Sequence, residues 1–433
     1  MLFNSYEFIF LFLPIVLLGY YVFLPKRARL PFLTLLSYVF YGWWDYRFCA
    51  LMLASTLIDY FSGLLIFRAS DPRRRRFWII ISVIANLSLL GFFKYFDLGA
   101  RTVNALAAWL GASSPLISLL HITLPVGISF YTFQSMSYSI DIYRGVVKPA
   151  RTFIEFACYV SLFPQLVAGP IIRYKDLADQ MVFRTHTMQK AAMGITFFII
   201  GLSKKVILAD GVAPIVAHVF GLSSPGLVEA WAGVLAYAMQ IYFDFSGYSD
   251  MAVGLGLMLG FRFCQNFNSP YKAISITDFW RRWHMSLSTW LRDYLYIPLG
   301  GNRKGPIRTY VNLTITMLLG GLWHGANWTF VIWGAYHGVL LAVERAMGKR
   351  GLARGPVLVQ RGVTFVLVLF SWVLFRCATV EQAAAMFAGM FGLQGAGLGV
   401  LPWLRDFPLP AVMIAVCALI AWGFRNTWEI RWR

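Results

Sequence analysis

A chain of 433 residues that is 59% hydrophobic and only 13% charged has too few polar side chains to cover a soluble fold of this length. The composition excludes an ordinary soluble globular protein and indicates a surface that faces lipid. A net charge of +19 would suggest a nucleic-acid partner in a soluble protein, but here Lys and Arg gather in short connections between apolar segments. We therefore predict no nucleic-acid partner.

Apolar segments of a length that crosses a bilayer recur along the whole chain. The residues before the first segment include Glu7 and no Lys or Arg, which argues against a cleavable signal peptide. The predicted spans cover residues 8–24, 30–45, 48–67, 77–94, 115–140, 153–170, 190–208, 228–243, 247–262, 309–324, 327–345, 362–377 and 408–424. Residues 380–404 are predicted to form one more span or an interfacial excursion. The fold class is all-α and polytopic, in a single membrane domain over residues 1–433 with about 11–13 transmembrane helices.

The connections between the early spans alternate in charge. Lys26–Arg29, Arg73–Arg76 and Arg144–Arg151 are basic, whereas the connections near residues 43–46 and 96–101 carry less charge. Because cytoplasmic loops collect Lys and Arg, we predict that the basic connections are cytoplasmic and the N-terminus external.

Residues 265–308 interrupt this pattern, because their Lys, Arg and Asp residues are too many for a lipid-facing helix. Ser275 or Thr277 is predicted to cap a helix N-terminus, with Asp278 in the first turn. At 3.6 residues per turn one apolar stripe forms, made of Ile276, Trp280, Trp283, Leu287, Trp290, Leu291 and Tyr294. We predict one amphipathic helix that packs over the membrane domain or lies in the interface, and that ends at Pro298 and Gly300–Gly301.

Three histidines lie near these apolar segments. His324 sits in Gly-Gly-Leu-Trp-His-Gly-Ala-Asn-Trp, in the middle of the charge-free stretch Thr309–Val343. A neutral imidazole there can accept a hydroxyl proton, although a histidine bonded within helix packing is the competing interpretation. His284 lies at the edge of the apolar stripe, where an interfacial position beside Arg281 is slightly favoured. His337 is predicted to be a packed structural histidine.

Two aspartates interrupt another apolar region. Asp244 and Asp250 lie in the sequence Tyr-Phe-Asp-Phe-Ser-Gly-Tyr-Ser-Asp, and buried carboxylates need partners. His284, His324 or nearby arginines are the candidate partners, and a structural ion pair is favoured over direct catalysis. The chain has no metal motif and no nucleophile elbow, so we predict no metal and no tightly bound cofactor.

Three stretches together resemble one enzyme family: YFDFSGYSD at residues 242–250, FWRRWHMSLSTWLRDYLYIPLGGNR at 279–303 and LWHGANWTFVIWGAYHG at 322–338. The chain is similar to the membrane-bound O-acyltransferases, and the YIPLGGNR ending most resembles the branch that acetylates bacterial alginate. The resemblance implies a ring of tilted helices around a central funnel, with the motif-bearing region at residues 240–340. It marks His324 as the family's invariant histidine and His284 as the second important one. The supporting or donor-binding residues that it implies are Asp244, Asp250, Trp280, Arg281, Arg292, Asp293, Asn302, Arg303, Trp323 and Asn327.

The resemblance also implies the substrates. The donor would be a cytoplasmic thioester, either acetyl-CoA or an acyl carrier protein, and the basic segment 281–308 would suit its negative charge. The acceptor would be hydroxyl groups of an exported polysaccharide in the pathway of a bacterial inner membrane. In similar systems a separate periplasmic protein receives the acyl group and completes the transfer.

Two other functions stay open. Within the family, D-alanyl transfer to teichoic acid from a carrier protein is the alternative. A transporter or flippase is the alternative from another class, because Asp and His at membrane depth also mark transport pathways. Many transporters contain two related halves, and the Trp-His-Gly segment has no counterpart in the first half of this chain.

The predicted topology can be tested with single cysteines introduced into a chain that lacks the five native ones. Arg74→Cys and Arg308→Cys should resist a membrane-impermeant thiol reagent in intact cells, and a cysteine near the N-terminus should react. Ready labelling of Arg74→Cys in intact cells would reverse the orientation.

Overall fold

The computed structural model describes residues 1–167, 169–348 and 355–430, and in this part of the chain every regular element is helical. The helices are α1 (Leu13–Leu18), α2 (Arg29–Gly42), α3 (Arg47–Arg68), α4 (Pro72–Leu90), α5 (Phe96–Trp109), α6 (Ile128–Tyr143), α7 (Phe153–Ser161), α8 (Phe163–Leu166), α9 (Tyr174–Val182), α10 (Met188–Ser203), α11 (Asp210–Phe220), α12 (Leu227–Met258), α13 (Ile276–Arg282), α14 (Met285–Leu291), α15 (Gly305–His324), α16 (Trp328–Ala346), α17 (Val357–Arg376), α18 (Val380–Met390), α19 (Val400–Asp406) and α20 (Pro408–Gly423). Several of these helices are joined by π-helical turns. Because every regular element of the described residues is helical, the predicted all-α class is confirmed.

Four helical stretches of the described residues are long and apolar enough to cross a membrane: Arg47–Arg68, Pro72–Trp109, Met188–Phe220 and Val357–Arg376. The pair α19 and α20, bent by 97°, would be a fifth if it formed one span. This length-and-composition count is below the predicted 11–13. Helices α15 and α16 do occupy predicted spans, but they carry buried polar side chains such as Asn312, Thr316 and His337, which make them less apolar.

Four predicted spans have the wrong extent. In the range 115–140 only the part from Ile128 onward is helical, because Gly127 at φ +77° begins the helix there. The range 153–170 is broken between α7 and α8, where Leu162 leaves the helical conformation before Pro164. The two spans predicted at 228–243 and 247–262 form the single helix α12, because Gly247 and the aspartates do not interrupt helical hydrogen bonding.

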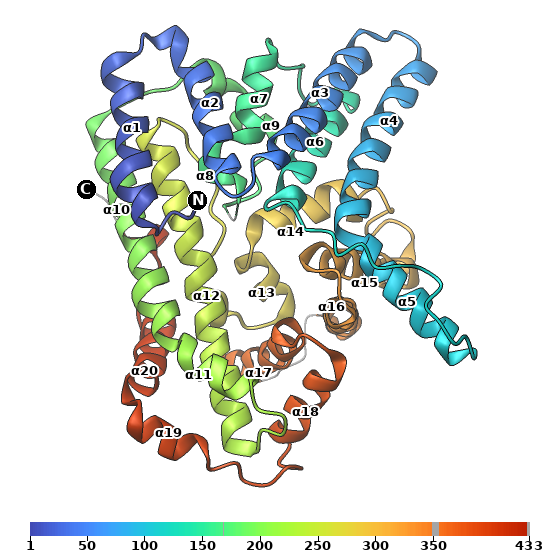
Figure 1. Cartoon of the computed structure of the whole chain (residues 1–433), viewed down its shortest axis with the longest axis vertical. Coiled ribbons are helices and arrows are strands. Elements are labelled where there is room, and N and C mark those ends of the chain that lie inside the picture. Colours follow the sequence, from blue (N-terminus) through green and yellow to red (C-terminus); the bar gives the residue numbers. More distant parts are fainter. Residues whose placement is uncertain (168, 349–354, 431–433) are drawn as a thin grey trace. The chain divides into compact units, whose positions relative to one another are not determined.

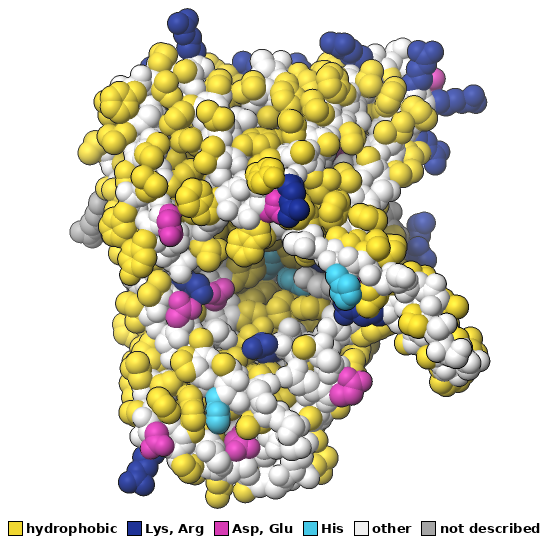
Figure 2. Space-filling view, viewed as in Figure 1, with side chains coloured by type: hydrophobic (Ala, Val, Ile, Leu, Met, Phe, Trp, Pro, Cys, Tyr) yellow, Lys and Arg dark blue, Asp and Glu magenta, His cyan; other side chains and the backbone are white. Residues whose placement is uncertain are grey.

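The described chain divides into two compact units, one made of Met1–Thr196 with Ala252–Cys264 and the other of Phe197–Met251 with Gln265–Arg433. In the first unit α3, α4 and α6 pack side by side (Figure 1). Figure 2 shows hydrophobic side chains over most of its visible face and a group of Lys and Arg side chains where α3 connects to α4. Exposed apolar side chains such as Phe10 (72% exposed) and Ile84 (59%) fit contact with lipid.

In the second unit, α15 and α16 form a closely packed antiparallel pair. A Cβ on Gly321 would lie 2.2 Å from the carbonyl oxygen of Phe330, and one on Gly334 would lie 2.5 Å from that of Met317. Glycine is therefore required at both positions, because the two backbones approach too closely for any side chain. The two helices connect through Gly325–Asn327, which are half-buried together with His324 at the end of α15.

Helix α12 of this unit is tied to a π-helical turn at Lys204–Ala209 by two ion pairs. Lys204 Nζ lies 2.6 Å from Asp250 Oδ2, and Lys205 Nζ lies 2.7 Å from Asp244 Oδ1. The prediction that a structural ion pair holds these aspartates fits this geometry, but the predicted partners are wrong. The partners are two adjacent lysines of the π-helical turn, each paired with one aspartate, rather than histidines or arginines.

Candidate active site

Residues 276–296 form two short helices and a π-helical turn rather than the single helix predicted. Ser275 caps α13 as predicted, because its hydroxyl accepts the backbone N–H of Asp278 at 3.1 Å. The helix then breaks at His284, whose φ of +43° lies in the left-handed region. The predicted stripe is nevertheless buried, since every member from Ile276 to Tyr294 is less than 10% exposed.

A left-handed backbone is unfavourable for a residue other than glycine, and the neighbouring chain maintains it at His284. Asn266 provides the support. Its backbone oxygen accepts the N–H of Met285 at 2.9 Å, and its side-chain oxygen accepts the N–H of Ser286 at 3.2 Å and the Ser286 hydroxyl at 2.8 Å. Its amide nitrogen donates to Ser249 Oγ on α12 at 3.1 Å.

The same Asn266 oxygen lies 3.1 Å from Nδ1 of His284. Because this oxygen already accepts a backbone N–H, it is an acceptor, and Nδ1 of His284 is the protonated ring nitrogen. The other nitrogen, Nε2, is buried and has no hydrogen-bond partner among the described residues. Burial lowers the pKa of His284 to about 3, so the ring is neutral and offers one lone pair at Nε2.

His324 ends α15 and lies beside His284. The two ring centroids are 6.3 Å apart, and the indole of Trp323 contacts both rings, at 5.9 Å from His284 and 5.0 Å from His324. The rings of Trp333 and Phe375 also contact His324, at 5.2 and 5.0 Å. The fold therefore brings the two predicted histidines together in an aromatic surround, although they are 40 positions apart in the chain.

His337 is fully buried, as predicted for a packed residue. Trp280 donates its indole N–H to Nδ1 of His337 at 3.3 Å. The Trp280 ring also lies 5.7 Å from that of Trp333, which contacts His324. Trp280 and Trp333 thus link His324, through ring contacts, to a cavity that Trp280 lines.

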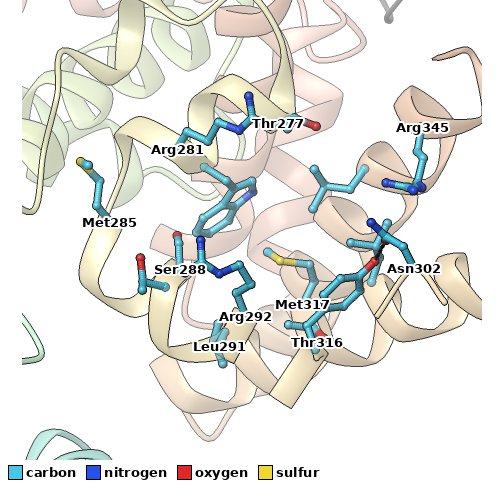
Figure 3. Close-up of a pocket in the computed structure, with 15 residues that line it drawn as sticks. Thr277, Arg281, Met285, Ser288, Leu291, Arg292, Asn302, Thr316, Met317 and Arg345 are labelled. Carbon is cyan, nitrogen blue, oxygen red and sulfur yellow. Dashed lines mark hydrogen bonds between the residues drawn. The ribbon is translucent and has the colours of Figure 1, made fainter. Parts of the chain in front are cut away.

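This cavity has a volume of about 550 Å³ and is lined by residues of α13, α14, α15 and α16 (Figure 3). Three arginines contribute to its lining: Arg281 and Arg292 lie on one side, and Arg345 of α16 on another. Its floor includes Met317 of α15, and Met285 next to His284 also lines it. Along α15, His324 lies two turns beyond Met317, or about 10 Å at the rise of an α-helix.

The remaining predicted site residues are distributed as follows. Trp280, Arg281, Arg292 and Asn302 line the cavity, and Asn302 accepts the hydroxyl of Tyr296. Asp293 pairs with Arg292 at 2.7 Å. Asn327 caps α16 by accepting the N–H of Thr329 at 3.3 Å and donates to the carbonyl of Ala378 at 2.5 Å. Arg303 is exposed and is not among the cavity-lining residues; Asp244 and Asp250 form the lysine pairs.

Two residues of this region were not predicted. Asn266 lies before the middle motif in a segment without charge, and Arg345 lies at the end of a predicted span, where basic residues ordinarily mark topology. Of the two, only Asn266 could have been identified from the sequence. It lies between Phe263 and Phe267, and a polar amide buried among apolar side chains needs hydrogen-bond partners.

Comparison with known proteins places the site in context. The family model described as MBOAT, membrane-bound O-acyltransferase family, matches residues 150–353. A probable alginate O-acetylase of Pseudomonas aeruginosa is 51% identical over 98% of this chain and 82% of its own length. The corresponding protein of Azotobacter vinelandii is 48% identical over 98% of this chain and 85% of its own length. A peptidoglycan O-acetyltransferase of Helicobacter pylori is 39% identical over 92% of this chain and 81% of its own length.

The support that Asn266 gives to His284 can be tested by substitution. Asn266→Ala should lower turnover by about 10-fold, because the hydrogen bond that sets the His284 tautomer is lost. The double variant with His284→Ala should be no worse than His284→Ala alone, since both changes remove one function. Asn268→Ala is the matched control in the same segment, bonded to Asn426 instead. Additive losses in the double variant would refute this coupling.

Proposed function

The chain belongs to the membrane-bound O-acyltransferase family, and we propose that it moves an acetyl group from a cytoplasmic thioester across the membrane toward hydroxyl groups of an exported polysaccharide such as alginate. It is an O-acyltransferase and a multi-pass membrane protein. The relatives named for alginate acetylation, at 48% and 51% identity, support the acetyl group and the acceptor. A bacterial inner-membrane location with an external N-terminus is part of the proposal.

The observation that carries the proposal is the position of His324. Its ring centroid lies 6.3 Å from that of the neutral His284, and His324 lies about 10 Å along α15 from Met317, which lines the cavity with three arginines. Acyl transfer needs a base at the reacting hydroxyl and a separate site that holds the charged part of the donor. This arrangement supplies both within one compact unit.

In the proposed reaction, His324 accepts the proton of the acceptor hydroxyl while the hydroxyl oxygen attacks the thioester carbonyl carbon. The bond between carbonyl carbon and oxygen forms, the bond between carbon and sulfur breaks, and the proton held by the imidazolium passes to the departing thiolate. No net proton is gained or lost. His324 is half-buried, and the aromatic rings that flank it limit the access of water to the thioester.

The hydrogen bonding of His284 limits the role that we propose for it, because it excludes donation of a hydrogen bond to the thioester carbonyl oxygen. Stabilising the carbonyl oxygen would require an N–H, but the protonated Nδ1 is bonded to Asn266. The Nε2 lone pair can only accept a hydrogen bond in this tautomer. We therefore assign His284 the task of accepting a hydrogen bond beside His324, either from the acceptor hydroxyl or from the protonated His324.

The three-arginine cavity is the proposed donor site. Arginine forms strong, directional hydrogen bonds to phosphate, and both acetyl-CoA and the prosthetic group of an acyl carrier protein carry phosphate groups. In the sequence, Arg345 is followed by three more basic residues, Lys349, Arg350 and Arg354. This supports a cytoplasmic donor side, in agreement with the predicted topology.

The alternatives are less well supported. D-alanyl transfer to teichoic acid would use the same chemistry, but the alginate relatives match nearly the whole chain. A transporter would not require the paired histidines beside an arginine-lined cavity. A periplasmic protein that carries the acetyl group onto the polymer stays a prediction, as does the funnel around the site.

The base can be tested by replacing His324 with Ala. General-base catalysis contributes about 10²–10⁴-fold, so the acetyl content of the exported polysaccharide should fall close to background. His121→Ala, an exposed histidine, is the matched control and should keep normal activity. Acetylation must be normalised to folded protein in the membrane. Near-normal acetylation by well-folded His324→Ala would end the general-base proposal.

The donor site can be tested separately with Arg281→Gln. The loss of one charge-assisted hydrogen bond should raise the KM for acetyl-CoA by about 10-fold while kcat changes little. Arg308→Gln removes an equal charge from the same basic segment outside the cavity and should leave the KM unchanged. Equal effects of the two substitutions would show that general surface charge, not the cavity, attracts the donor.

A further inference from the structure

Basic side chains of the first unit meet at Tyr20, outside the proposed reaction. Tyr20 lies in the π-helical turn Gly19–Phe23, which ends the first apolar helix. Arg184 donates from Nε to the Tyr20 hydroxyl at 3.1 Å, and Nε2 of His186 lies 3.0 Å from the same oxygen. The guanidinium carbon of Arg29 lies 4.9 Å from the centre of the Tyr20 ring. Two arginines and a histidine therefore share one tyrosine, and we call this group the Tyr20 cluster.

The Tyr20 cluster is held in place by segments that lie far apart in the sequence. Arg29 begins α2, whereas Arg184 and His186 lie between α9 and α10. The Nη1 group of Arg184 donates to two backbone carbonyls of α9, both at 3.1 Å. A Cβ on Gly260 would lie 2.8 Å from Nε2 of His186, so the imidazole packs directly against the backbone there. The basic groups are therefore fixed by the fold and are not free side chains of a loop.

The positive charge of the Tyr20 cluster is not compensated within the described residues. No Asp or Glu among them forms an ion pair with Arg29 or Arg184. The Nε–H of Arg29 is shielded from solvent and has no hydrogen-bond partner in the described part of the chain. The pKa of His186 is lowered, first by burial and then by the positive charges of Arg29 and Arg184. Cations that repel one another in this way attract an anion.

The place of the Tyr20 cluster along the helices indicates what kind of anion fits. Arg29 begins the apolar helix α2, and His186 lies two residues before the candidate span Met188–Phe220. Tyr and Arg side chains at the ends of apolar helices are typical of the membrane–water interface. Phe23 and Phe183, which adjoin the cluster in the sequence, are 74% and 83% exposed. A ligand with one phosphate and apolar chains complements both kinds of side chain.

We propose that the Tyr20 cluster binds the phosphate of an anionic phospholipid, with Arg29 and Arg184 as its principal ligands. Arginine N–H groups match phosphate oxygens in pairs, and the Tyr20 ring orients the guanidinium of Arg29. The lipid belongs to the leaflet at the Lys26–Arg29 connection, which the predicted topology makes cytoplasmic. This site is distinct from the proposed donor cavity and from His324, which belong to the second unit.

The test titrates purified full-length protein in a neutral detergent with phosphatidylglycerol, phosphatidylcholine or inorganic phosphate. The melting temperature and the lipid retained in native mass spectra are both measured. Phosphatidylglycerol should raise the melting temperature of the wild type, and the other two should raise it little, because a ligand that binds the folded state stabilises it. Arg29→Gln should weaken phosphatidylglycerol binding about 10-fold, through the loss of charge-assisted hydrogen bonds. Without lipid, this variant should melt as the wild type does.

Two further variants make the result specific. Arg74→Gln removes an equal charge from another basic connection, where the side chain is exposed, and should bind phosphatidylglycerol as the wild type does. Arg29→Lys keeps the charge but not the paired bonds, so it should bind more weakly than the wild type even if Arg29→Gln folds poorly.

The inference stands if both Arg29 variants lose affinity for phosphatidylglycerol and Arg74→Gln does not. Unchanged binding by Arg29→Lys and by folded Arg29→Gln would overturn it, as would an equal loss in Arg74→Gln, which would indicate attraction by general surface charge. Equal stabilisation by inorganic phosphate would identify a dissolved anion as the ligand and overturn the lipid assignment. Equal binding of phosphatidylcholine would show that the site does not select a negative headgroup, which also contradicts the inference.

Discussion

The site depends on one side-chain oxygen, Oδ1 of Asn266. It accepts hydrogen bonds from the backbone and hydroxyl of Ser286 and from the ring of His284, while the amide nitrogen of Asn266 bonds to Ser249 on α12. These bonds offset the strain of the left-handed backbone at His284. They turn the chain between α13 and α14 and set the tautomer of His284, so that its free lone pair is at Nε2. A buried polar network of this kind is rigid only when all its members are satisfied.

Much of the architecture could be predicted because its causes are local. Low charge and long apolar segments predict a helical membrane protein, and Ser275 caps α13 because a short hydroxyl side chain before Asp278 satisfies a free N–H. The stripe from Ile276 to Tyr294 is buried even though the helix breaks at His284, since the break turns the chain without exposing its apolar side. Family motifs then selected His324 and His284, which the fold brings to a ring separation of 6.3 Å.

The rest depends on contacts between distant segments. The break at His284 follows from hydrogen bonds to Asn266, 18 positions earlier, and nothing in the local sequence at His284 requires it. The lysine partners of Asp244 and Asp250 come from another helix through a π-helical turn, which hydrophobic periodicity does not reveal. Arg345 resembles an ordinary basic residue at a helix end until the cavity that it lines is known.

The central claim is that the chemistry at His324 takes place between a donor that enters at the basic ends of the helices and an acceptor on the opposite side of the membrane. The most direct measurement uses vesicles in which the protein is inserted with its basic loops outward. Labelled acetyl-CoA is added outside, and a uronate oligosaccharide is trapped inside. The account predicts that the trapped oligosaccharide becomes acetylated while the acetyl-CoA stays outside. Acetylation that occurs only when donor and acceptor share one side of the membrane would contradict it.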